Sequence, residues 1–96
     1  MWLLIDDMRN LNCDAIARNS KAAKQLLTLD CWECVCFDHD LGEGYSGYDV
    51  MKWMFENNIR PKNIQIVTSN PVGRENMNAI LRSEHYTSKD GFNWEL

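Results

Sequence analysis

Acidic side chains follow two short apolar runs of this sequence, at the point where each run ends. Asp6 and Asp7 come directly after residues 2–5, and Asp38 comes after an apolar run that ends at Phe37. At an effective dielectric constant near 20, two carboxylates ~4 Å apart repel each other by about 4 kcal/mol. A divalent cation removes that cost, and carboxylate oxygens are ligands that Mg²⁺ and Mn²⁺ take. The pattern therefore favours a metal site made by Asp6, Asp7 and Asp38, and the alternative is polar strand ends or helix caps.

His39 and Asp40 come directly after Asp38. Histidine titrates near neutral pH, and a neighbouring carboxylate fixes the tautomer of its ring, so the two together are common material for general acid–base catalysis. We therefore expect Asp38, His39 and Asp40 to form the catalytic group, with His39 transferring protons. The alternative is a loop histidine that hydrogen-bonds to a backbone carbonyl.

A third polar segment, residues 68–74, ends another apolar run and begins a predicted helix. The N–H groups and the positive dipole end of a helix start favour a phosphate. Hydroxyl and amide groups there add donors, and an arginine one turn later can offer the same anion several N–H groups. The predicted phosphate-binding residues are Thr68, Ser69, Asn70 and Arg74. The alternative is ordinary helix capping, with a solvated arginine.

The elements that would position these residues alternate between strands and helices. Apolar runs predict strands over residues 2–6, 15–18, 33–37 and 63–68. Helical spacing and start and stop signals predict helices over residues 21–27, 48–57 and 71–82, the last capped by Asn70 with Pro71 in its first position. Residues 86–88 have the composition of a fifth strand at the sheet edge, and residues 92–94 are expected to fold back onto the body.

This alternation is typical of the α/β class, as an open parallel sheet with right-handed crossovers and helices on both faces. With the strands numbered along the chain, the order 2-1-3-4 places the first and third strands side by side at the switch point. Asp6, Asp7 and Asp38 would then leave the carboxyl ends of adjacent strands.

Ninety-six residues, 45% of them hydrophobic, predict one domain over residues 1–96. No apolar run approaches the roughly 20 residues that cross a bilayer, and the N-terminus lacks the basic segment of a signal peptide, so we expect a cytoplasmic protein with no membrane partner. A net charge of −4 argues against bulk, non-specific nucleic-acid binding. A single phosphate or a nucleotide still fits, because a bound metal reverses the local charge. Tyr45, in a loop rich in glycine, is the aromatic candidate for stacking on a base.

The spacing of the acids resembles the receiver domain of bacterial response regulators, in which paired acids and a phosphoacceptor aspartate hold Mg²⁺. On that resemblance Asp6 and Asp7 match the acid pair, Asp38 matches the phosphoacceptor, and Thr68 matches the hydroxyl that contacts the phosphoryl group. The lysine on the fifth strand of a receiver has Lys89 as its candidate here. The first crossover helix is missing from the pattern, so the expected domain is a truncated receiver of the flavodoxin-like type.

A closer resemblance is to the cyclic-phosphate processing receiver-like domains, and three motifs carry it. They are Ile-Asp-Asp-Met-Arg at residues 5–9, Phe-Asp-His-Asp-Leu-Gly at 37–42 with Ser-Gly-Tyr-Asp-Val at 46–50, and Val-Thr-Ser-Asn-Pro-Val-Gly-Arg at 67–74. One position departs from the family pattern, because the histidine at the end of the fourth strand is Val67 here.

The resemblance implies a metal-dependent phosphoesterase, with Mg²⁺ or Mn²⁺ as cofactor, that processes a cyclic phosphate on a nucleotide or at an RNA end. Val67 and the acidic charge leave a second hypothesis, a non-enzymatic degenerate receiver that binds a nucleotide or a protein partner. A third hypothesis is a true phosphoacceptor receiver with Asp38 as the acceptor, which needs a lysine near the site.

Overall fold

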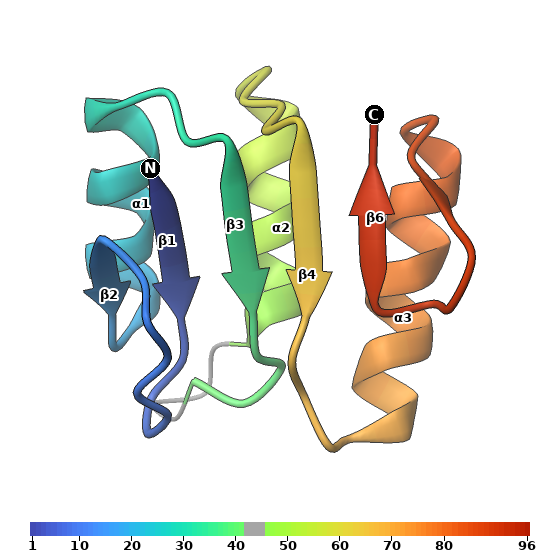
Figure 1. The fold of residues 1–96 in the computed structure, drawn as a ribbon, viewed down its shortest axis with the longest axis horizontal. Coiled ribbons are helices and arrows are strands. Elements are labelled where there is room, and N and C mark those ends of the chain that lie inside the picture. The colour runs from blue at the N-terminus through green and yellow to red at the C-terminus, as the bar shows by residue number, and fades with distance from the viewer. Residues whose placement is uncertain (42–45) are drawn as a thin grey trace.

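The computed structural model describes residues 1–41 and 46–96, and within them the chain forms one six-stranded sheet and three helices (Figure 1). Tyr45 and the rest of residues 42–45 lie outside the described residues. In chain order the elements are β1 (Trp2–Ile5), β2 (Ala15–Ala17), α1 (Ser20–Leu29), β3 (Cys34–Phe37), α2 (Gly47–Glu56), β4 (Asn63–Ile66), α3 (Pro71–Ser83), β5 (Thr87–Ser88) and β6 (Asn93–Glu95). Each predicted strand and helix is present, with bounds that differ by at most two residues.

The order of the first four strands is confirmed, since β2, β1, β3 and β4 are parallel neighbours in that sequence. The far end of the sheet differs from the prediction. There β6 pairs antiparallel with β4, and β5 pairs antiparallel with β6, so the sheet is mixed and β5 is its edge. The reason is a tight turn at Asp90, whose side chain accepts hydrogen bonds from the N–H groups of Phe92 and Asn93 at 2.9 and 2.8 Å. This turn folds residues 93–95 back into the place beside β4.

The prediction of helices on both faces of the sheet is wrong, because α1, α2 and α3 all lie on one face (Figure 1). Right-handed crossovers that move along a sheet in one direction place their helices on one side. The connections that carry α1, α2 and α3 all move in the same direction, from β2 toward β5. The steps from β1 to β2 and from β5 to β6 move the other way, and neither of them carries a helix. The described residues therefore place no helix on the opposite face.

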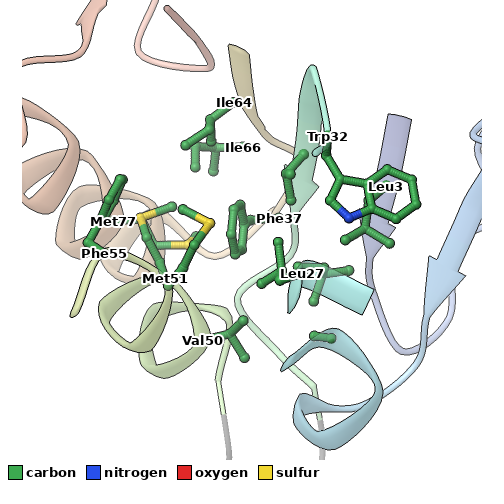
Figure 2. Close-up of a cluster of buried hydrophobic side chains, with 14 of the residues drawn as sticks. Leu3, Leu27, Trp32, Phe37, Val50, Met51, Phe55, Ile64, Ile66 and Met77 are labelled. Atoms are coloured by element: carbon green, nitrogen blue, oxygen red, sulfur yellow. The ribbon is translucent and has the colours of Figure 1, made fainter. Parts of the chain in front are cut away.

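The main core lies between the sheet and its three helices, and Figure 2 shows part of it. Phe37 of β3 is fully buried there, close to Leu27 of α1, Met51 of α2 and Ile66 of β4. Truncating a buried phenylalanine to alanine typically costs 3–5 kcal/mol, so this residue fixes the position of the strand that ends at Asp38. None of the helices in the described residues is both long and apolar enough to span a membrane.

Candidate functional site

Three carboxylates meet at the carboxyl edge of the sheet, where β1 and β3 end. One oxygen each from Asp6, Asp7 and Asp38 lies within 4.8 Å of the other two. The pairing of Ile5 with Phe37 places the residues after these strands side by side. Asp6 is 1% exposed and Asp38 is 7% exposed, whereas Asp7 is more open to solvent. The structure thus brings together the three acids for which the sequence predicted a metal site.

Arg9 joins this cluster, although the sequence analysis gave it no role. Asp6 Oδ1 accepts hydrogen bonds from the N–H groups of Met8 and Arg9, both at 2.9 Å, which curls the chain back toward the acids. Arg9 Nη1 then lies 3.2 Å from Asp6 Oδ2 and 3.5 Å from Asp38 Oδ1. The sequence signal that could have identified Arg9 is its place in the motif at residues 5–9. Its guanidinium neutralises part of the charge that a metal would neutralise.

The surroundings of Asp38 leave its carboxylate incompletely neutralised. Burial and the nearby charge of Asp6 raise the pKa of Asp38 above its usual value. Hydrogen bonds from the Thr68 hydroxyl and the His39 N–H, together with the charge of Arg9, act in the opposite direction and do not cancel the increase. A cluster of hard oxygen ligands with excess negative charge is the chemistry that a cation such as Mg²⁺ or Mn²⁺ relieves. The residues present therefore fit a divalent metal.

His39 lies in the loop after β3, and its ring contacts the start of α3. Its Nδ1 is 3.1 Å from Asp40 Oδ1 and 3.4 Å from Asn70 Nδ2. Its ring packs against Gly73, where a Cβ atom would overlap the imidazole. When Nδ1 carries a proton and donates it to Asp40, Nε2 is the basic nitrogen of the ring. Asp40 thus has the geometry to fix the tautomer, and Gly73 leaves the space that the ring occupies.

The start of α3 uses its own N–H groups internally. Asn70 is the cap, as the sequence indicated, and its Oδ1 accepts from the N–H groups of Val72 and Gly73, both at 3.1 Å. The Thr68 hydroxyl oxygen accepts from the Asn70 N–H at 3.0 Å and also interacts with Asp38. The N–H groups of Val72 and Gly73 are therefore already used by the cap. An anion at this helix end would bind to side-chain donors and be stabilised by the helix dipole.

Ser69 and Arg74 are the other two residues predicted to bind phosphate, and Ser69 is exposed where α3 begins. The guanidinium of Arg74 lies 4.6 Å from the centroid of the Phe92 ring. The Phe92 carbonyl accepts from the Ile66 N–H at 2.7 Å, so this ring stands at the end of β4. Arg74 is consequently held at the same edge of the sheet as the acids, with an aromatic partner.

A family model described as Cyclic-phosphate processing Receiver domain matches residues 1–83 of this sequence. The chain belongs to this family. The match confirms the resemblance read from the three motifs, and it contains the acid cluster, His39 and the whole of α3. Among curated proteins, no sequence matches the chain significantly.

Lys89, the candidate for the receiver lysine, lies beyond the matched part of this receiver domain. It follows β5, and β6 separates β5 from β4. Neighbouring strands lie about 5 Å apart, so β5 is about 5 Å farther from β3 than a strand that pairs directly with β4 would be. The added strand moves Lys89 away from Asp38.

Val67, which replaces the family histidine, follows β4 and lies on the sheet face that has no helix. It is partly buried and packs against a small cluster that includes Leu4 and Cys36. Its N–H donates to the Phe37 carbonyl at 2.9 Å, so its backbone is fixed beside the residue that precedes Asp38. A histidine here would extend from a position next to the acid cluster.

Proposed function

We propose that this receiver domain is a divalent-metal-dependent phosphoesterase that hydrolyses a cyclic phosphate on a nucleotide or at an RNA end. The observation that carries the proposal is the convergence of three carboxylates within 4.8 Å at the edge where His39 and the start of α3 also lie. The family described by the matching model processes cyclic phosphates, which supplies the substrate class.

Asp6, Asp7 and Asp38 would hold Mg²⁺ or Mn²⁺. Such an ion, when bound, polarises a phosphoryl oxygen and lowers the pKa of water. The rest of the reaction needs a proton acceptor and groups that hold the phosphate.

His39 is the residue suited to move the proton. With Nδ1 donating to Asp40, Nε2 can accept a proton from the attacking water as its oxygen bonds to phosphorus. The same nitrogen can return the proton to the ester oxygen that leaves when the ring of the cyclic phosphate opens. Asp40 holds the ring in the required tautomer and stabilises its charged form.

The phosphate would be held by the side chains at the start of α3. The Ser69 hydroxyl and the Asn70 amide offer neutral donors, and Arg74 offers a charged group from the first turn of the helix. Thr68 is buried against Asp38 and positions that carboxylate as well as the cap. Donors fixed in place before the reaction stabilise the charge that develops in its transition state.

Turnover of a 2′,3′-cyclic nucleotide with Mg²⁺ or Mn²⁺ tests the proposal. His39→Ala should lower kcat by about 10²–10⁴-fold, the usual contribution of general acid–base catalysis, with little change in phosphate binding. His85→Asn is the matched control, because His85 is exposed and has a φ of 71°, a conformation that asparagine tolerates. Equal losses in the two variants would remove His39 from the mechanism.

A binding module without turnover is the second candidate, and the apolar packing of Val67 favours it. Its ligand would be a nucleotide or a protein partner. If the natural chain shows no turnover with either metal because it lacks the family histidine, Val67→His should restore turnover. Absence of turnover in both chains, with ligand binding retained, would establish the binding module and refute the enzyme.

A further inference from the structure

Three of the four cysteines gather on the face of the sheet opposite the helices. Cys34 and Cys36 are buried on β3, and Cys13, just before β2, is partly buried and packs against them. The Cys36 thiol is central, since it interacts with the thiols of both Cys13 and Cys34, and it also donates to Gln65 Oε1 at 3.4 Å. The fourth cysteine, Cys31, is exposed and lies outside this thiol cluster.

The apolar side chains that pack around the three cysteines do not react with an oxidised thiol, so another thiol of the cluster is its reaction partner. The side chains that complete the cluster are Leu4, Ile16 and Val67, all of them apolar. Cys13 is its most exposed thiol, so a small oxidant in solution reaches that sulfur first. A buried thiol then lies directly behind it.

The thiol contacts select Cys36 as the partner of Cys13, because the thiols of these two residues hydrogen-bond to each other. Residues two apart on a strand have Cα atoms about 6.6 Å apart, near the upper limit for a disulfide, so Cys34 and Cys36 are poorly placed to bond to each other. Cys13 lies outside a strand, in the connection between β1 and β2, and can adjust its position toward Cys36.

We propose that Cys13 and Cys36 form a reversible oxidation site, in which hydrogen peroxide converts the two thiols into a disulfide. The Cys13 sulfur attacks a peroxide oxygen, the O–O bond breaks, and one water leaves as a sulfenic acid forms. The Cys36 sulfur then attacks the Cys13 sulfur and displaces the hydroxyl group as a second water. In sum, two thiols lose two hydrogen atoms to one peroxide.

This bond would act on the connection that carries the acids. The segment from Asp6 to Cys13 holds Asp7 and Arg9, and Cys36 is two residues before Asp38. A disulfide would therefore tie the loop that follows Asp6 to β3, the strand that Asp38 follows. The inference concerns a second site and stands whether or not the domain hydrolyses a cyclic phosphate.

Peroxide treatment of the reduced full chain tests this inference. The buffer should be mildly alkaline, because burial raises the pKa of the Cys13 thiol. The expected product is a monomer that has lost two hydrogen atoms and regains them with a thiol reductant. Trypsin separates Cys13, in residues 10–18, from the other three cysteines, in residues 25–52, so the two peptides should stay linked without reductant. Because the bond closes a loop of about 24 residues, Tm should rise by on the order of 10 °C.

Single substitutions identify the partner of Cys13. Cys13→Ser and Cys36→Ser should each abolish the linked peptides, whereas Cys34→Ser and the control Cys31→Ser should retain them. Cys13→Ser changes a partly exposed residue and keeps the test valid if Cys36→Ser fails to fold. Linked peptides that persist in Cys36→Ser but vanish in Cys34→Ser would overturn the assignment. So would dimers formed only through Cys31, or overoxidation of Cys13 without any bond.

Discussion

Arg9 Nη1 lies 3.5 Å from Asp38 Oδ1, and the same nitrogen is 3.2 Å from Asp6 Oδ2. A single guanidinium thus bridges the ends of β1 and β3, the two strands at the switch point of the sheet. A divalent cation held by these carboxylates would be repelled by the positive charge of Arg9. We therefore expect Arg9 and the cation to compete for the same oxygens.

Arg9→Gln should strengthen the binding of Mg²⁺ or Mn²⁺ by about tenfold, because the cation no longer displaces the guanidinium from the carboxylates. A hydrogen bond between charged groups contributes roughly 1.5–3 kcal/mol, and the partial exposure of Arg9 reduces that contribution here. Calorimetric titration with the metal alone measures this change. Arg82→Gln, at the far end of α3, removes the same charge and should change the affinity little. Weaker metal binding by Arg9→Gln would show that Arg9 supports the metal site instead.

Asp38→Asn should raise the thermal stability of the metal-free protein at pH 7 by a few degrees. The pKa of Asp38 is raised by burial and by the charge of Asp6, so its ionised form lowers stability above the folded-state pKa. That loss is relieved as the pH falls through the folded pKa toward the unfolded value near 3.9. The advantage of the variant should therefore disappear near pH 4.

Thermal unfolding in a chelator at pH 7 and pH 4 measures the effect of Asp38→Asn. Glu75→Gln, at an exposed position of α3, is the control for the loss of one negative charge. Millimolar Mg²⁺ or Mn²⁺ should raise the Tm of the natural chain by mass action and should have less effect on Asp38→Asn. Equal metal responses in the two proteins would exclude Asp38 as a ligand.

Gly73→Ala should lower turnover by about 10²-fold without unfolding the protein. The added Cβ atom would overlap the His39 ring and force it to turn, and misplacing a catalytic group by ~1 Å costs about that much. Alanine favours the helix by up to about 1 kcal/mol, which offsets part of the strain. Activity should be measured together with imidazole NMR signals, and Val72→Ala, exposed in the same turn, is the control. Unchanged imidazole signals in Gly73→Ala would contradict the packing argument.

Arg74→Ala should weaken phosphate binding by roughly 1.5–3 kcal/mol, the range for hydrogen bonds to charged groups. Its effect on stability should be about 0.5–1 kcal/mol, from the lost contact with the Phe92 ring. Arg82→Ala is the matched control, because Arg82 lies over the Trp94 ring at 5.8 Å, elsewhere on the same helix. Similar phosphate affinities in the two variants would leave Arg74 with a packing role only.

The sequence alone determined which acids meet and at which edge. Apolar runs that end at Asp6 and Asp38 predicted strands of one small sheet, and the carboxyl ends of parallel strands lie at the same edge. The cap at Asn70 was equally readable, because capping depends on residues close together in the chain. The family motifs, confirmed by the matching model, depend on the same local spacing.

The tertiary structure decided contacts between segments that are distant in the sequence. The bridge from Arg9 to Asp38 and the packing of His39 on Gly73 depend on how loops approach one another across the sheet. The placement of all three helices on one face depends on the direction in which each connection moves, and the place of β6 depends on the turn at Asp90. Periodicity records which face of its own element a residue occupies, but it does not record which side chains from other elements meet there.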